Sequence, residues 1–460
     1  MTKTIANAFY GSFFHTPLYG TFEYLENALI EVDEDGIIAG VYKADDPAQA
    51  PLLARFRAEG RLTELGENRY GLPGFVDIHV HAPQWPQAAL ALDEPLYLWL
   101  EQRTFPLESM FKDVDFANKV YTDLVQQLTA RGTTTVVYLG STHLEANVEL
   151  ARICADFGQR ALVGKTVMDD PTANPEYYRD ATTATALADT ETFIKEVEAI
   201  ARGAKQGIWP VVTPRFIPSC TDEGLRGLGD IAAKYDVYVQ THCNEGQWEH
   251  DVVLDRYGKT DPYALRDFGL LREHSIMAHC PYLTEEEGEM FAELGVGIAH
   301  CPMANSYFSS AVAPIQRFRR QGINVGLGTD ISGGYSPSMY ENIRQTVLIS
   351  RLLETGVNAM LPPEQRGGLG DDTRMSLVDA FWLATAGGGE VLGQKLAKFE
   401  VGYPLDLQVV DVKRKDSDLT GFGVFDQPGD RLARILYLST PDNVRRVYCQ
   451  GKLLRDKDAE

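Results

Sequence analysis

The sequence has 460 residues, of which 44% are hydrophobic and 23% are charged, a balance typical of a globular protein and too apolar for a disordered one. Because 65 acidic residues outnumber 43 basic ones, the formal net charge is −22. Such a surface repels phosphate, so nucleic acid and anionic membrane are poor candidate partners. We therefore expect a soluble enzyme that acts on a small molecule.

The expected compartment follows from three negative features. The first eleven residues contain no apolar core of signal-peptide length. No run reaches the ~18 apolar residues that a membrane helix needs. The six cysteines are scattered and form no Cys-x-x-Cys pair, which fits reduced thiols better than a disulfide framework. We expect a cytoplasmic protein.

Both ends of the chain have the composition of β-structure. Residues 21–32 and 37–42 are rich in aromatic and branched side chains and are separated by a turn signal at 33–36. A polar stretch follows at 44–61. Near the other end, residues 405–412 and 445–454 are strand-like, with few helical periods between them.

The middle of the chain repeats one pattern, in which a short apolar run precedes a longer helical stretch. Strand–helix alternation implies parallel strands joined by crossover helices. Eight such units favour an α/β fold, a (β/α)8 TIM barrel, over residues 70–391. The expected strands are 71–81, 133–140, 160–169, 208–216, 237–245, 275–280, 296–302 and 324–330. The expected helices include 115–130, 145–157, 190–204, 222–235, 284–294 and 339–354.

Ionisable side chains stand at the ends of four of the expected strands. His79 and His81 are separated by one residue, so on a strand they point to the same side. His242, His279 and Asp330 end three further strands. In a TIM barrel these ends meet at one face, which carries the active site. Imidazoles and a carboxylate gathered there can bind a divalent metal, whereas any one histidine alone could be an ordinary core residue.

Several segments of the chain resemble one enzyme family. Together the motifs resemble the guanine deaminases, which belong to the one-metal deaminase branch of the amidohydrolase superfamily. The resemblance covers about residues 70 to 450. The segments that carry it are 71–84 (GLPGFVDIHVHAPQ), 213–216 (TPRF), 241–245 (THCNE) and 326–339 (GLGTDISGGYSPSM), with 104–106 (TFP) and 156–165 (DFGQRALVGK) in support.

The resemblance implies an architecture and a reaction. The barrel would be joined by a small β-sandwich domain built from residues 1–69 and 392–460. The reaction would be hydrolytic deamination of the purine guanine to xanthine and ammonia, in purine catabolism. Relatives of this kind imply a homodimer.

The resemblance also implies roles at a metal site with one ion per chain. The ligands would be His79, His81, His242 and Asp330, and the metal would be Zn²⁺, with Fe²⁺ also compatible with this donor set. Such a metal lowers the pKa of its bound water toward ~7. Asp330 would take the proton of that water, and His279 would hydrogen-bond the attacking hydroxide. Glu245 would protonate the ring nitrogen beside the attacked carbon; the alternative is a solvated loop carboxylate.

Substrate recognition is expected from residues beside these ligands. The amide of Gln84 both donates and accepts, which suits a purine edge with N–H beside C=O. Arg215 would bind the O6 carbonyl, and Phe216 would pack on the ring. His81, His242 and Glu245 would also face the substrate. The alternatives are a surface glutamine, a salt-bridged arginine and a core phenylalanine.

The remaining candidates carry weaker signals. Lys165 is the residue that could carry the bridging carbamate of a two-metal amidohydrolase, but it lies inside its expected strand and not at the end. For His300, at the end of the seventh strand, a place beside the pocket and a structural role are equally open. Surface or satisfied-core roles are expected for His15, His143, His250 and His274, and packing roles for Cys243, Cys280 and Cys301.

Three other functions stay open at this point. The first is deamination of another aminopurine or pterin, such as 8-oxoguanine or isoxanthopterin, because these rings share the amide edge of guanine. Departures from the family pattern at 301–305 and 280–281 also leave the ring substrate open. The second is hydrolysis of a cyclic amide at a two-metal site with carbamylated Lys165. The third is a catalytically silent interaction protein, although such a protein has no need of Glu245 beside a metal site.

Overall fold

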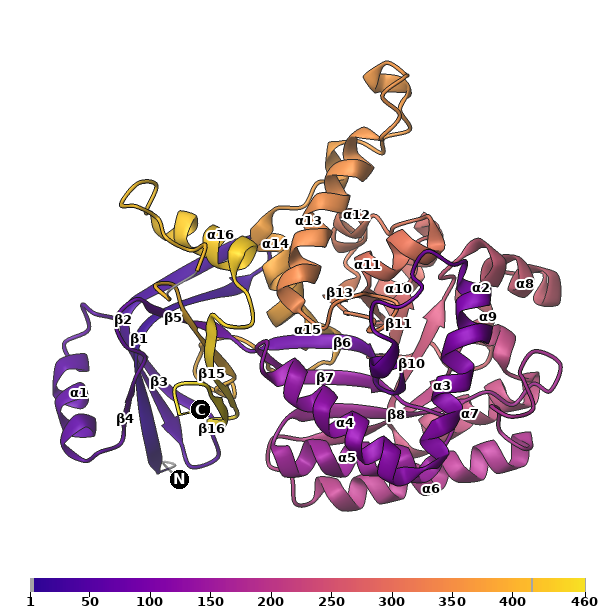
Figure 1. The fold of residues 1–460 in the computed structure, drawn as a ribbon, viewed down its shortest axis with the longest axis horizontal. Helices are drawn as coiled ribbons and strands as arrows, with labels where there is room; N and C mark the ends of the chain where they lie inside the picture. The colour runs from indigo at the N-terminus through magenta and orange to yellow at the C-terminus, as the bar shows by residue number, and fades with distance from the viewer. Residues whose placement is uncertain (1–3, 415–416, 460) are drawn as a thin grey trace.

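A computed structural model describes residues 4–414 and 417–459, and its strands form two eight-stranded sheets (Figure 1). The first sheet has the order β13-β12-β11-β10-β9-β8-β7-β6, and its neighbouring strands are all parallel. Its strands are β6 (Phe75–His81), β7 (Thr133–Leu139), β8 (Arg160–Val167), β9 (Ile208–Pro214), β10 (Tyr238–Cys243), β11 (Ile276–His279), β12 (Gly297–His300) and β13 (Asn324–Leu327). The predicted (β/α)8 barrel is confirmed.

Helices cover the outside of this barrel (Figure 1). Polar side chains mark where several of them begin. Asp113 caps α4 by accepting from two backbone N–H groups, and Thr284 and Glu287 form a capping box on α10. The principal helices are α4 (Val114–Thr129), α5 (Leu144–Phe157), α6 (Thr183–Ala201), α7 (Asp222–Tyr235), α10 (Glu285–Leu294), α12 (Ile315–Arg320) and α13 (Met339–Thr355). Shorter ones are α2 (Leu96–Trp99), α3 (Phe105–Ser109), α8 (Gln247–Tyr257), α9 (Asp261–Asp267), α11 (Pro302–Ala304), α14 (Leu377–Trp382) and α15 (Gly388–Val391).

The second sheet is built from both ends of the chain, in the order β16-β15-β14-β5-β1-β2-β3, with β4 beside β1. The ends meet where β14 pairs antiparallel with β5. An apolar core lies against this sheet, in which the ring of Phe9 meets that of Tyr448 edge-on at 5.1 Å. The strands are β1 (Ile5–Leu18), β2 (Thr21–Asp33), β3 (Ile38–Tyr42), β4 (Leu62–Glu64), β5 (Arg69–Pro73), β14 (Leu407–Asp411), β15 (Val444–Cys449) and β16 (Lys452–Asp456).

The small domain departs from the sequence prediction in several elements. Its first strand, β1, has 14 residues, whereas short strands broken by turns were expected over the first 70 residues. The expected strand at 445–454 is two strands with a turn between them. Helix α1 (Gln49–Ala58) lies in the stretch expected to be merely polar, and α16 (Pro428–Leu438) lies where few helical periods were expected. The expected ranges 1–69 and 392–460 also extend over residues 1–3, 415–416 and 460, which lie outside the described part of the chain.

The predicted strand at 71–81 is divided between the two sheets at Gly74. A Cβ at this position would lie 2.2 Å from the side-chain oxygen of Thr134, so only glycine allows the chain to pass from one sheet to the other here. A buried ion pair also joins the domains, because Arg160 of β8 contacts Asp406, the residue before β14. The small domain is thereby fixed to the end of the barrel opposite the expected site.

Two further observations concern membrane-spanning helices and the state of the cysteines. None of the helices within residues 4–414 and 417–459 is long and apolar enough to cross a bilayer. All six cysteines are free thiols, and all are buried.

Candidate active site

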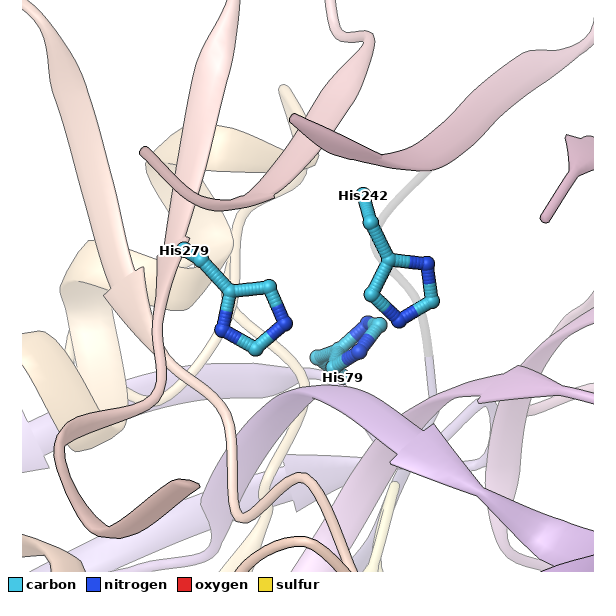
Figure 2. A group of neighbouring side chains, drawn as sticks. All are labelled: His79, His242 and His279. Carbon is cyan, nitrogen blue, oxygen red and sulfur yellow. The ribbon is translucent and has the colours of Figure 1, made fainter. Parts of the chain in front are cut away.

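The five strand-end residues converge at the C-terminal mouth of the barrel. His79 and His81 lie on β6, His242 on β10 and His279 at the end of β11, while Asp330 follows β13. All five are buried. Figure 2 shows the rings of His79, His242 and His279 turned toward one point. The expectation that parallel strands bring these distant residues together is met by this geometry.

The spacing of the donor atoms fits a shared metal ion. The Nε2 atoms of His81 and His242 are 3.0 Å apart, and Oδ1 of Asp330 lies 3.3 Å from Nε2 of both His79 and His81. Ligands ~2.0–2.2 Å from a tetrahedral ion are separated by about 3.3–3.5 Å, so the observed distances lie within a few tenths of an ångström of this value. His279 lies slightly farther from the Asp330 carboxylate than His79 and His81 do, with its Nε2 3.8 Å from Oδ2.

The protonation states also suit a metal. Burial lowers the pKa of His81 and of His279 to about 4, and it lowers the pKa of His242 well below the usual value. These imidazoles are therefore neutral and carry free lone pairs. Burial alone would raise the pKa of Asp330, but the imidazoles of His79 and His81, each 3.3 Å from its Oδ1, hold it well below its usual value.

Within residues 4–414 and 417–459, several of these nitrogens have no hydrogen-bond partner. Both ring nitrogens of His79, both of His279 and Nδ1 of His81 are buried and unpaired. Buried polar atoms without partners are costly and uncommon, so a set of them around one point indicates that something else binds there. A divalent cation would satisfy the nitrogens that converge.

Backbone contacts hold the ligands in place. The Nδ1–H of His242 donates to the carbonyl of Arg215 across 2.5 Å, which leaves Nε2 as the lone-pair nitrogen. The N–H of Asp330 donates to the carbonyl of His79 across 2.8 Å. Asp330 and His279 have φ values of 50° and 75°, in the left-handed region that non-glycine residues seldom adopt. Each of these turns directs a side chain into the mouth immediately after its strand.

Cys301 lies close enough to be a further ligand candidate. Its sulfur, a nitrogen of His279 and an oxygen of Asp330 lie within 4.8 Å of one another. Burial raises the pKa of the Cys301 thiol well above its usual value, however, and a metal binds the thiolate and not the thiol. This thiol instead donates to the carbonyl of Ala299, as expected for a packing role.

Glu245 lies beside the converging histidines. Its carboxylate is 3.6 Å from Nε2 of His279, and its side chain is only 13% exposed. Burial, followed by repulsion from Asp330, raises the pKa of Glu245 to about 8, so the acid is protonated at neutral pH. These values do not describe a solvated loop carboxylate.

Two buried carboxyl groups hold the turn that carries Glu245. Glu249 accepts the backbone N–H of Glu245 across 2.7 Å, and Asp261 accepts that of Asn244 across 3.1 Å. Asn244 has a φ of 42°, so the chain turns sharply here. Successive amides fixed by two carboxyl groups determine where the Glu245 side chain enters the site.

A cavity of about 780 Å³ opens in front of this group. Aromatic side chains form part of its wall, which suits a flat ring. Phe216 is one of them, and its ring lies 6.3 Å from that of His242 and 5.9 Å from that of Trp248. Among the predicted residues, the cavity is lined by His81, Gln84, Arg215, Phe216, His242, Glu245 and Asp330.

Glu108, a fully buried residue of α3, was not predicted from the sequence. Its two oxygens lie 2.7 and 3.3 Å from the guanidinium nitrogens of Arg215, and it accepts 2.9 Å from Nε2 of Gln84 and a further bond from the hydroxyl of Tyr178. Arg215 is therefore salt-bridged and also faces the cavity. The nearby TFP segment at 104–106 was the only sequence signal for this region.

The structure keeps other candidates away from the convergence point. Lys165 is buried in β8 and pairs with Asp180 at 2.9 Å. His300 is buried at the end of β12 and does not line the cavity, and burial lowers its pKa to about 3. His15 contacts Glu23 in the small domain at 3.1 Å. His143, His250 and His274 also lie outside the cavity lining.

Known proteins are similar to this chain along almost its whole length. A sequence model of the amidohydrolase family matches residues 70–454. Guanine deaminase from Mus musculus is 35% identical over 461 residues, which cover 98% of this chain and 97% of that protein, and the Homo sapiens enzyme is 34% identical over 455 residues. The crystal structure of guanine deaminase from C. acetobutylicum with bound guanine in the active site matches with a TM-score of 0.85 and 30% identity, covering 97% of this chain and 99% of that one. This chain belongs to the amidohydrolase family.

Proposed function

We propose that this protein is a guanine deaminase, which converts guanine and water into xanthine and ammonia. One observation carries the proposal: Glu245 and a group of converging imidazoles with one carboxylate stand at the mouth of a cavity that also presents Gln84 and Arg215. The similarity to guanine deaminases over nearly the full length supports it.

His79, His81, His242 and Asp330 would hold one divalent metal, and Zn²⁺ suits their neutral nitrogens and single carboxylate. When bound, this metal supplies a water whose pKa is lowered toward ~7, so that hydroxide is available at neutral pH. Asp330 accepts the proton of the water on its second oxygen. His279, with its Nε2 3.8 Å from that oxygen, hydrogen-bonds the attacking oxygen and orients it.

Glu245 moves the protons of the reaction. As a neutral acid it protonates the ring nitrogen beside C2 while the oxygen adds to C2 of guanine. Its carboxylate then takes the hydroxyl proton of the oxygen that has added to C2 and passes it to the 2-amino group, which leaves as ammonia while the C2 carbonyl forms. The proton held by Asp330 then returns to Glu245, which restores both groups. One water is consumed, and xanthine remains. Glu249 fixes the backbone of Glu245 during both transfers.

Recognition of the purine falls to the side chains that line the cavity next to the metal ligands. Gln84 and Arg215 contact the edge that carries N1 and O6, and the positive charge of Arg215 stabilises the negative charge that develops on O6. Phe216 packs against the ring, and His81 and His242 border the same space.

A substrate panel with ammonia detection tests this function. We expect guanine to release ammonia fastest, ahead of isoxanthopterin and 8-oxoguanine, and we expect adenine and cytosine to be inert. The pterin and the oxidised purine are the serious rivals, because they share the amide edge that Gln84 and Arg215 contact. A higher kcat/KM with either ring than with guanine would replace the proposed substrate.

The remaining features of the proposal are a cytoplasmic homodimer that acts in purine catabolism. Free, buried cysteines suit a reducing compartment.

The segment after α13 projects from the barrel (Figure 1). In this segment the side chain of Val357 is 70% exposed and that of Met360 is 90% exposed. Exposed apolar side chains of this kind mark interfaces, and a second copy would supply the same surface in return. Light scattering should give a dimer, and Met360→Asp should weaken it.

A further inference from the structure

A single buried carboxylate contacts both side chains that face the purine edge. Glu108 lies behind the cavity wall and contacts the guanidinium of Arg215 with both oxygens. The oxygen that lies 3.3 Å from Arg215 also accepts the Nε2–H of Gln84 across 2.9 Å. Gln84 and Arg215 are far apart in the sequence, so Glu108 is what joins them into one recognition surface.

The contacts of Gln84 leave its amide only one orientation. Burial would raise the pKa of Glu108, but the charge of Arg215 holds it below its usual value, so the group is a carboxylate that only accepts. At the other end of the amide, Oε1 accepts the backbone N–H of Ser332 across 3.3 Å, and this group only donates. A flipped amide would place oxygen against the carboxylate and NH₂ against the N–H, losing both bonds.

Resting on the proposed function, we infer that Glu108 is a positioning residue that sets the hydrogen-bond polarity of the pocket. It turns the nitrogen end of Gln84 toward the side on which Arg215 stands. Both side chains then offer donors on that side, and the oxygen of Gln84 is the acceptor on the other side.

This polarity defines a class of substrate. A lactam edge, with C=O beside N–H, matches a pocket that presents donors and then an acceptor, and guanine carries this edge at C6 and N1. An amidine edge, with C–NH₂ beside a bare ring nitrogen, has the reverse pattern. 2,6-Diaminopurine carries that reversed edge and the same 2-amino group as guanine. The site should therefore accept 2-amino heterocycles with a lactam edge and reject those with an amidine edge.

The test compares kcat/KM for guanine and for 2,6-diaminopurine in the metal-loaded wild type, E108Q and E108D. For the wild type we expect guanine to be preferred by roughly 100-fold or more, since two hydrogen bonds are lost with the other ring. An amide at position 108 can donate as well as accept, so it allows the side-chain amide of Gln84 to flip. The preference of E108Q for guanine over 2,6-diaminopurine should therefore fall at least about tenfold. E108D still only accepts, so it should lose rate yet keep the preference.

The ratio of two substrates distinguishes this role from a merely structural one, because general damage to the site lowers both values together. A wild type that deaminates guanine, combined with an E108Q that keeps the full preference, would overturn the inference while leaving the proposed function intact. If E108Q does not fold, the wild-type ratio decides, and equal use of the two purines overturns the inference. No ammonia from guanine in the wild type would remove the proposed function itself.

Discussion

Lys165 of β8 and Asp180, in the connection after this strand, form a buried ion pair, with Nζ of the lysine 2.9 Å from Oδ1 of the aspartate. The second oxygen of Asp180 accepts the backbone N–H of Met168 across 2.8 Å, so both ends of the carboxylate are in use. A bridging carbamate needs the lysine nitrogen to be free of its charge partner. Lys165 therefore has a structural role here and is not free to carry a bridging carbamate.

The first prediction follows from this pair. Elemental analysis of the purified protein should give one equivalent of transition metal per chain. Lys165→Met should leave that stoichiometry unchanged in the folded protein, but it should lower the free energy of unfolding by about 3–5 kcal/mol, because Asp180 is left buried and unpaired. Two equivalents in the wild type, with a carbamylated Lys165 in its mass spectrum, would instead favour the two-metal cyclic amidase.

The second prediction concerns Glu245. Glu245→Gln should lower turnover of guanine by about 10²–10⁴-fold with metal content unchanged, because an amide cannot deliver the proton to the ring. Glu289→Gln, an exposed position on α10, is the matched control and should turn over normally. Near-normal turnover in Glu245→Gln would show that another group transfers the proton.

The positions of the strand-end residues could be predicted because two simple rules determine them: side chains alternate along a strand, and parallel strands all end at the same face. His79 and His81 are two residues apart on β6, so their side chains point to the same side of the strand. The parallel arrangement brings His242, His279 and Asp330 to the same end of the barrel. Both rules depend only on short apolar runs, which the sequence shows clearly.

Glu108 could not be predicted in the same way. It lies on the short helix α3 within the long connection between β6 and α4, and its partner Arg215 is 107 residues away. No periodicity links such a pair, since the contact exists only after the loop has packed on the barrel mouth. Helix α16 was missed for a different reason: its start depends on Gln427 and Asp430 as caps, and glutamine is not one of the favoured N-cap residues.

The third prediction uses metal removal as its readout. Asp330→Ala should abolish both guanine turnover and tight metal binding, since the carboxylate contacts two of the imidazoles. A bound metal stabilises the folded state by about 2.7 kcal/mol at 100 times its Kd. A chelator should therefore lower the unfolding midpoint of the wild type and leave that of Asp330→Ala unchanged. A chelator that leaves the wild-type midpoint unchanged would argue against a resident metal.

The fourth prediction separates recognition from metal binding at Arg215. The backbone carbonyl of this residue holds the ring of His242, and its guanidinium faces Glu108 and the cavity. Arg215→Ala removes the side chain alone, so metal content should stay at one equivalent while kcat/KM for guanine falls by about 10–100-fold, the loss expected for a hydrogen bond to a charged group.

Stability should fall as well in Arg215→Ala, because the charge of Glu108 is left buried without its partner. Arg226→Ala is the matched control: this arginine lies exposed on α7 over the ring of Phe268, and its loss should change neither kcat/KM nor metal content. If Arg215→Ala loses metal in proportion to activity, then the side chain acts through the position of His242 and not on the purine. Equal activity of the two variants would leave Gln84 as the group that contacts the purine edge.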